Sequence, residues 1–86
     1  MPIISTFYGI IIRMNFGDHN PPHFHAEYQG FQAAFEISTG KLAAGEFPAN
    51  ARRLVESWAK TNRGALLANW KHAVAMEPIE RIPGME

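Results

Sequence analysis

The chain contains no cysteine, which excludes disulfide bonds, thiolate metal ligands and a cysteine nucleophile. Any bound metal must therefore be held by imidazole nitrogen and oxygen atoms. The sequence also lacks an apolar run that approaches the roughly 18 residues needed to span a bilayer, and it shows no signal-peptide pattern. We expect a cytoplasmic protein with no membrane association.

An excess of charge of either sign is also missing, because eight basic residues balance eight acidic ones. The balance is uneven along the chain, since residues 48–76 hold five cations and a single acidic residue. These cations are Arg52, Arg53, Lys60, Arg63 and Lys71. Such a segment either binds phosphates or an acidic partner, with Arg52 and Arg53 as candidate binding residues, or forms the solvated face of two helices.

A length of 86 residues allows only a modest hydrophobic core. No internal repeat or low-complexity segment divides the chain. We expect a single domain over residues 1–86 that gains stability from a partner, an ion or association as a homodimer.

The first half of the sequence has the composition and spacing of β-strands. Runs rich in β-branched and aromatic residues lie between groups of Gly, Asn, Asp and Pro. They predict strands over residues 7–14, 23–28 and 31–38, with a fourth over 41–47. Gln29-Gly30 supplies a two-residue hairpin turn, and counting outward from it gives the register. The expected pairs are Tyr28 with Phe31, Glu27 with Gln32, His25 with Ala34 and His23 with Glu36.

The second half has helical spacing. A first helix begins at Pro48 and has apolar positions at Ala51, Leu54, Val55, Trp58 and Ala59. A second helix is capped by Asn62 and has an apolar stripe formed by Leu66, Leu67, Trp70 and Val74. Residues 79–82 alternate like a short strand. We predict an α+β fold, a three- or four-stranded antiparallel β-meander with two C-terminal α-helices packed on one face.

Three of the four histidines fall within the stretch from Asp18 to Tyr28. Side chains alternate between the two faces of a strand, so His23, His25 and Glu27 share one face while the apolar residues between them share the other. The Pro21-Pro22 pair makes the preceding loop stiff. This stretch is therefore the candidate site for chemistry.

The histidine stretch has three interpretations. In the first, His19, His23 and His25 are metal ligands, with Asp18, Glu27 or Glu36 completing the shell of a divalent cation such as zinc. In the second, histidines act as general acid and base on a phosphodiester, with charge stabilised by Arg13, Arg52 or Arg53 and with Tyr8 or Tyr28 as an extra donor or stacking surface. In the third, the histidines only brace the loop. This interpretation is favoured for any single histidine but weakens for the group, because three imidazoles packed around a rigid loop repel one another at lower pH.

The sequence also resembles a known family, the small bacterial proteins grouped as domain of unknown function 4160. The resemblance is carried by the segment from Ile3 through Ile10, by Ile12-Arg13-Met14, by the whole motif from Asp18 to Tyr28 and by Asn69-Trp70. It implies a toxin-like component of a toxin–antitoxin module, paired with a small antitoxin-like partner of another uncharacterised family, numbered 2442. The candidate site that it carries over is Arg13, Asp18, His19, His23, His25, Glu27 and Tyr28.

Together these observations lead to one main hypothesis and two alternatives. The main hypothesis is a toxin that acts on RNA or on translation, in which His23 and His25 are the acid/base pair or metal ligands, Asp18 and Glu27 orient them, and Arg13 contacts phosphate. The alternatives are a non-enzymatic module that binds a protein or nucleic acid, and a protein that binds metal through histidine and carboxylate ligands.

Overall fold

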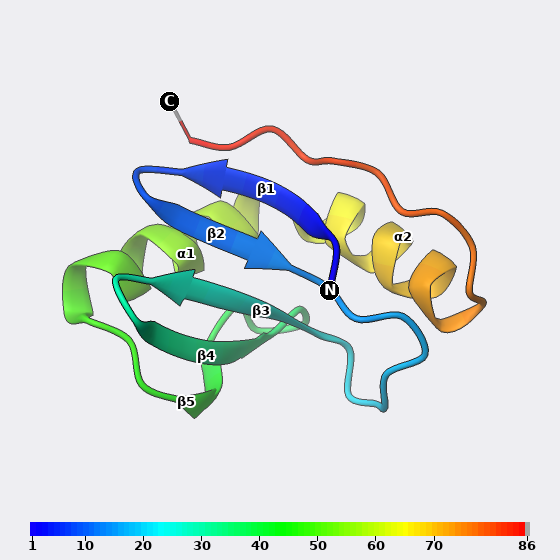
Figure 1. Ribbon diagram of the computed structural model, residues 1–86, viewed down its shortest axis with the longest axis horizontal. Helices are drawn as coiled ribbons and strands as arrows, with labels where there is room; N and C mark the ends of the chain where they lie inside the picture. The colour runs from blue at the N-terminus through cyan, green and yellow to red at the C-terminus, as the bar shows by residue number, and fades with distance from the viewer. Residues whose placement is uncertain (86) are drawn as a thin grey trace.

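The computed structural model describes residues 1–85 and has the topology of a meander followed by two helices (Figure 1). The strands are β1 (Ile3–Phe7), β2 (Ile10–Arg13), β3 (His23–Tyr28), β4 (Phe31–Glu36) and β5 (Leu42–Gly45). The helices are α1 (Ala49–Thr61) and α2 (Arg63–Val74). All neighbouring strands pair antiparallel in the order β1-β2-β3-β4-β5. The α+β prediction is confirmed, but the sheet has five strands rather than three or four.

The additional strand comes from a hairpin within the segment that was expected to form one strand over residues 7–14. Tyr8 and Gly9 turn the chain with φ angles of 50° and 80°, and Phe7 then pairs with Ile10. Left-handed φ angles at both central residues are typical of the tight turns that match the twist of a hairpin. The prediction of a single long strand is therefore wrong. The turn divides the segment into the end of β1 and the whole of β2.

The hairpin of β3 and β4 has the expected register, from the pair Tyr28 and Phe31 to the pair His23 and Glu36. Gln29 and Gly30 form its turn, with φ angles of 47° and 84°. This register places Phe24 and Ala26 on the side of the helices, where both are fully buried. It leaves His23 and His25 on the other side, which is called the open face below.

Helix α1 packs on the sheet through Ala51, Val55, Trp58 and Ala59, as its spacing predicts. Trp58 is central to this packing, since its indole contacts the rings of Phe7 and Phe24. Pro48 is the residue that precedes the helix, with an extended backbone at φ −60° and ψ 145°. Figure 1 shows both helices behind the same face of the sheet.

Helix α2 is rotated relative to the predicted stripe. Its buried residues are Leu66, Asn69, Trp70 and Ala73, whereas Leu67 and Val74 are 37% and 49% exposed. Asn62 does not cap the helix through its side chain, because its amide instead donates to the carbonyl oxygen of Trp58 at the end of α1. The position of α2 is thus set by tertiary contacts on a different face from the one that hydrophobicity indicates.

The chain after α2 crosses back along β1 (Figure 1). The prediction of a strand over residues 79–82 is wrong, because these residues form no regular secondary structure. The N–H of Ile82 nevertheless donates to the carbonyl oxygen of Ile4 in β1 at 2.7 Å. The indole N–H of Trp58 donates to the Pro83 carbonyl oxygen at 2.9 Å, which holds this segment over the core. Within residues 1–85, neither helix has the length and apolarity that crossing a membrane requires.

Candidate functional site: an aspartate between two histidines

The loop that connects β2 to β3, residues 14–22, is held at both ends by backbone hydrogen bonds. The N–H of Gly17 donates to the carbonyl oxygen of Ala73 in α2 at 2.9 Å. At the other end, the N–H of Ile37 donates to the carbonyl oxygen of Pro22 at 3.0 Å. The Asn20–Pro21 peptide bond between them is cis. The two hydrogen bonds give the loop a defined path that carries Asp18 back over the start of β3.

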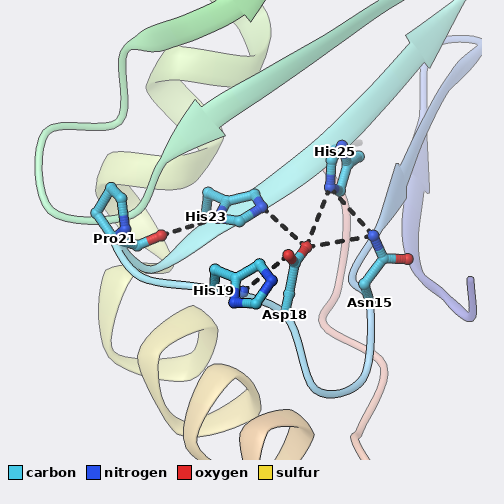
Figure 2. Close-up of polar contacts among 6 residues, drawn as sticks. All are labelled: Asn15, Asp18, His19, Pro21, His23 and His25. Atoms are coloured by element: carbon cyan, nitrogen blue, oxygen red, sulfur yellow. Dashed lines mark hydrogen bonds and ion pairs between the residues drawn. The ribbon is translucent and has the colours of Figure 1, made fainter.

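Asp18 lies between two imidazole rings on the open face (Figure 2). Its Oδ2 atom is 3.0 Å from His23 Nε2 and 3.7 Å from His25 Nε2. Its other oxygen, Oδ1, accepts the backbone N–H of His19 at 2.8 Å, so the carboxylate cannot turn freely. The three side chains, named the Asp–His cluster below, are only 18–28% exposed. Their ligand atoms all lie within 4.8 Å of one another.

His23 is fixed through both nitrogens and through its ring face. Its Nδ1 atom is 2.8 Å from the carbonyl oxygen of Pro21, and a carbonyl oxygen can only accept, so Nδ1 carries hydrogen. The ring also lies against the indole of Trp70 and forms an edge contact with His25, with centroids 5.2 Å and 5.1 Å apart. The orientation of His23 Nε2 toward Asp18 therefore follows from packing as well as from hydrogen bonding.

Asn15 is a member of the site that the sequence analysis did not identify. Its Nδ2 atom lies 3.3 Å from Asp18 Oδ2 and 3.4 Å from His25 Nε2, so it contacts two cluster residues at once (Figure 2). A single asparagine just after a strand carries no recognisable motif. Its only sequence signal is its position three residues before Asp18 on the same loop.

The hydrogen bonds of Asp18 keep its carboxylate ionised. The backbone N–H of His19 is the main cause that lowers the pKa of Asp18 below its ordinary value, while partial burial acts in the opposite direction. The amide of Asn15 and the imidazole of His23 lower the pKa further. The cluster thus presents a negative charge between two imidazole nitrogens.

Arg13 and Glu27 lie beside the cluster and bind each other. Arg13 Nε donates to Glu27 Oε1 at 2.7 Å, and a second guanidinium nitrogen donates to the Met1 carbonyl oxygen at 2.9 Å. Arg13 pairs with His25 across β2 and β3, which explains its location. Glu27 shares the face of His23 and His25 as expected, but its described contact is with Arg13 and not with an imidazole.

The remaining candidate residues do not belong to the group of converging ligand atoms. The His19 side chain is exposed and outside the group of converging ligand atoms. Glu36 accepts a hydrogen bond from Thr39, and the Tyr28 ring lies on the helix side against Phe47. Arg52 pairs with Glu56, and Arg53 donates to Asn50. Arg52 lines a surface depression together with Phe31, which is at the opposite end of the β3–β4 hairpin from His23.

The fold and site together define a small α+β domain with an Asp–His cluster on the open face of its sheet. A family model described as "Domain of unknown function (DUF4160)" matches residues 9–71, which include the whole cluster and its loop. The chain belongs to this family. No curated protein and no solved structure matches it.

Proposed function

We propose that this protein is the toxin component of a bacterial toxin–antitoxin module and that it acts on RNA, or on the translation machinery, through the Asp–His cluster. The observation that supports a chemical role is the convergence of His23 and His25 on one carboxylate oxygen, at 3.0 Å and 3.7 Å. A loop that needed only bracing would not require two imidazoles around the same charge. The resemblance to the family supplies the toxin–antitoxin setting.

The reaction that suits this site is attack of a ribose hydroxyl or a water molecule on the phosphorus of a phosphodiester. The new P–O bond forms as the bond to the leaving oxygen breaks, the nucleophile gives up a proton to an imidazole, and the leaving oxygen takes one up. Imidazoles exchange protons near neutral pH, and a carboxylate can orient them. His23 is fixed at both nitrogens by Pro21 and Asp18, whereas the described polar contacts of His25 involve only Nε2. We assign to His25 the contact with the substrate, and to His23 and Asp18 the task of fixing the geometry around it.

In this proposal the antitoxin-like partner is a small cytoplasmic protein that blocks access to the open face. Arg52, Arg53, Arg63 and Lys71 are exposed on the two helices and are the candidate phosphate contacts for RNA.

Growth arrest on induced expression tests this function. We expect arrest with the wild-type chain and none with His23→Ala/His25→Ala, when both proteins are matched for soluble amount and circular dichroism. The control is His72→Ala, because His72 is exposed and pairs with Glu77 away from the cluster. Loss of arrest in the control, or equal arrest in all three strains, would contradict a toxin that acts through these histidines.

A non-enzymatic binding module is the second candidate, and one observation favours it. Phe31 is 40% exposed and lines a depression with Phe47, Pro48 and Arg52, which offers apolar contact beside a cation. If the protein acts by binding RNA there, Arg52→Ala/Arg53→Ala should weaken RNA binding and reduce its dependence on salt concentration. The His23→Ala/His25→Ala protein should then bind RNA as the wild type does.

A further inference from the structure

We infer that Asp18, His23 and His25 form a binding site for one divalent transition-metal cation, with zinc as the best-suited ion. The binding itself follows from the geometry of the cluster. The role of the cation, which is to bring an RNA phosphate to the site, rests on the proposed function above.

The spacing of the three ligand atoms fits a four-coordinate cation. Zinc bonds to histidine nitrogen and carboxylate oxygen are about 2.0–2.2 Å long, so adjacent ligands of a tetrahedral site lie roughly 3.3–3.5 Å apart. The distances from Asp18 Oδ2 to the two Nε2 atoms, 3.0 Å and 3.7 Å, lie on either side of that range. Shifts of a few tenths of an ångström would therefore bring Asp18 Oδ2 to ligand spacing with each imidazole, and all three ligand atoms already lie within 4.8 Å of one another.

The hydrogen-bond pattern of His23 also leaves Nε2 available to a cation. With Nδ1 donating to Pro21, the other ring nitrogen, Nε2, is the one that faces Asp18 Oδ2 at 3.0 Å. Nε2 donates a hydrogen to the carboxylate or, without that hydrogen, offers a lone pair to a cation. A metal ion can take the place of that hydrogen and accept one lone pair from Nε2 and one from Oδ2.

The surroundings of the ligands resemble the outer shell of known metal sites. Metal-binding histidines usually donate their second ring N–H to a carbonyl or carboxylate oxygen, as His23 does to Pro21. The second oxygen of a ligating carboxylate is likewise hydrogen-bonded, as Asp18 Oδ1 is to the His19 N–H. These contacts hold two ligands in place before any ion arrives, which lowers the entropic cost of binding.

Asn15 adds a fourth donor at the same point. Its amide nitrogen lies within 3.4 Å of both Asp18 Oδ2 and His25 Nε2. Rotation of the amide by half a turn would place its oxygen where the nitrogen now lies, since the two ends of the group are nearly the same size. A donor set of two nitrogens with oxygens suits zinc, cobalt or nickel better than magnesium or calcium.

The charges near the cluster explain why a cation would matter for RNA. The charge of Arg13 is offset by Glu27, which leaves the negative charge of Asp18 between the two imidazoles. A phosphate approaching this point would be repelled by the carboxylate. A bound divalent ion reverses the local charge and can polarise a phosphoryl oxygen.

Isothermal titration with zinc chloride tests the site, with cobalt chloride as a spectroscopic probe of coordination. We expect one ion per chain and at least a tenfold loss of affinity in Asp18→Asn and in His25→Ala. His19→Ala and His72→Ala are matched controls, because both side chains are exposed histidines outside the cluster. Circular dichroism of the ion-free proteins verifies the fold, and a zinc-dependent rise in the thermal midpoint should occur in the wild type and the controls only.

The outcomes separate this inference from the proposed function. Stoichiometric zinc binding that depends on Asp18 and His25 supports the metal site even if none of the proteins arrests growth. Absence of zinc binding, or equal binding by wild type and His25→Ala, overturns the metal site. If growth arrest then still requires His25, the proposed toxin function remains with metal-free acid/base chemistry.

Discussion

The imidazole of His23 lies against the indole of Trp70, with ring centroids 5.2 Å apart and ring planes inclined by 49°. Trp70 is 5% exposed and belongs to the hydrophobic core, whereas His23 turns its Nε2 atom toward Asp18 at the open face. The core and the cluster therefore meet at this contact. Changes in the packing of α2 should be transmitted to the position of one imidazole.

Replacement of Trp70 by alanine should lower the free energy of unfolding by about 3–5 kcal/mol, because it removes a large buried side chain. Urea denaturation followed by circular dichroism measures this loss. Leu67→Ala is the control on the same helix. Because Leu67 is 37% exposed, its replacement should lower the free energy of unfolding much less. Similar losses for the two variants would show that Trp70 does not contribute to the core as its burial indicates.

Asp18 should make the stability of the protein depend on pH. Its pKa is lowered by the His19 N–H, so the folded state favours the carboxylate more than the unfolded chain does. This stabilisation is present above the unfolded pKa of about 3.9 and is lost as the pH falls through the lower folded pKa. We expect Asp18→Asn to be less stable than wild type at neutral pH.

The measurement is urea denaturation of both proteins at a series of pH values between about 7 and 2.5. The difference in stability should narrow over the acidic part of this series. Glu77→Gln is the control, because Glu77 and its partner His72 are 59% and 53% exposed. A difference between wild type and Asp18→Asn that stays constant down to the lowest pH would rule out the ionised carboxylate as its source.

The ion pair of Arg13 and Glu27 should contribute more to the stability of the folded protein than an exposed ion pair does. Its side chains are 27% and 30% exposed, and we expect a coupling free energy of about 0.5–1 kcal/mol in a double-mutant cycle with Arg13→Met and Glu27→Gln. The comparison is the pair of Arg52 and Glu56 on α1, with an expected coupling of about 0.3–0.5 kcal/mol.

Both cycles should be measured by urea denaturation at low and at high salt. The coupling free energy of Arg13 and Glu27 should fall less at high salt than that of Arg52 and Glu56, because dissolved ions screen a less exposed pair less. Arg13→Met alone should lower the free energy of unfolding more than Glu27→Gln alone, because Arg13 also donates to the carbonyl oxygen of Met1. Equal coupling in the two pairs at both salt concentrations would contradict this ranking.

Two glycines should respond in opposite directions to alanine. A Cβ atom at Gly84 would lie 2.5 Å from the Thr6 carbonyl oxygen and 2.9 Å from Phe7 Cβ, whereas one at Gly64 would meet no atom within 4 Å. Gly84→Ala should therefore lower the free energy of unfolding by about 1–3 kcal/mol, because the C-terminal segment would be pushed off β1.

Gly64→Ala should instead raise the free energy of unfolding by up to about 1 kcal/mol, as alanine favours a helix. Chemical denaturation of the two variants in parallel with the wild type measures both effects. A Gly84→Ala protein as stable as Gly64→Ala would show that the C-terminal segment is not held against β1.

The sequence predicted the β3–β4 hairpin well because alternation and the Gln29-Gly30 turn are local signals. The β1–β2 hairpin was missed because Tyr8, which adopts a positive φ, is not a residue that usually indicates a tight turn. The rotation of α2 was missed for a tertiary reason. Asn69 is buried because its amide makes two hydrogen bonds to the backbone of Glu80, which is distant in the sequence.

The same limit applies to the candidate site. Alternation placed His23, His25 and Glu27 on one face correctly, since all three belong to one strand. The location of Asp18 depends on the path of a loop, and the contacts of Asn15 depend on that path as well. Glu27 was expected to orient a histidine, but the pairing of β2 with β3 brings Arg13 within reach of its carboxylate instead.

The turn at Gln29 and Gly30 lies at the end of β3 farthest from His23, yet it decides which side of the sheet the histidines occupy. One inserted residue that shifted the pairing by a single position would exchange the two faces of β3. Phe24 and Ala26 would then be turned toward water, and the two imidazoles would be turned into the core. The number of residues in this turn is therefore as much a determinant of the site as the histidines themselves.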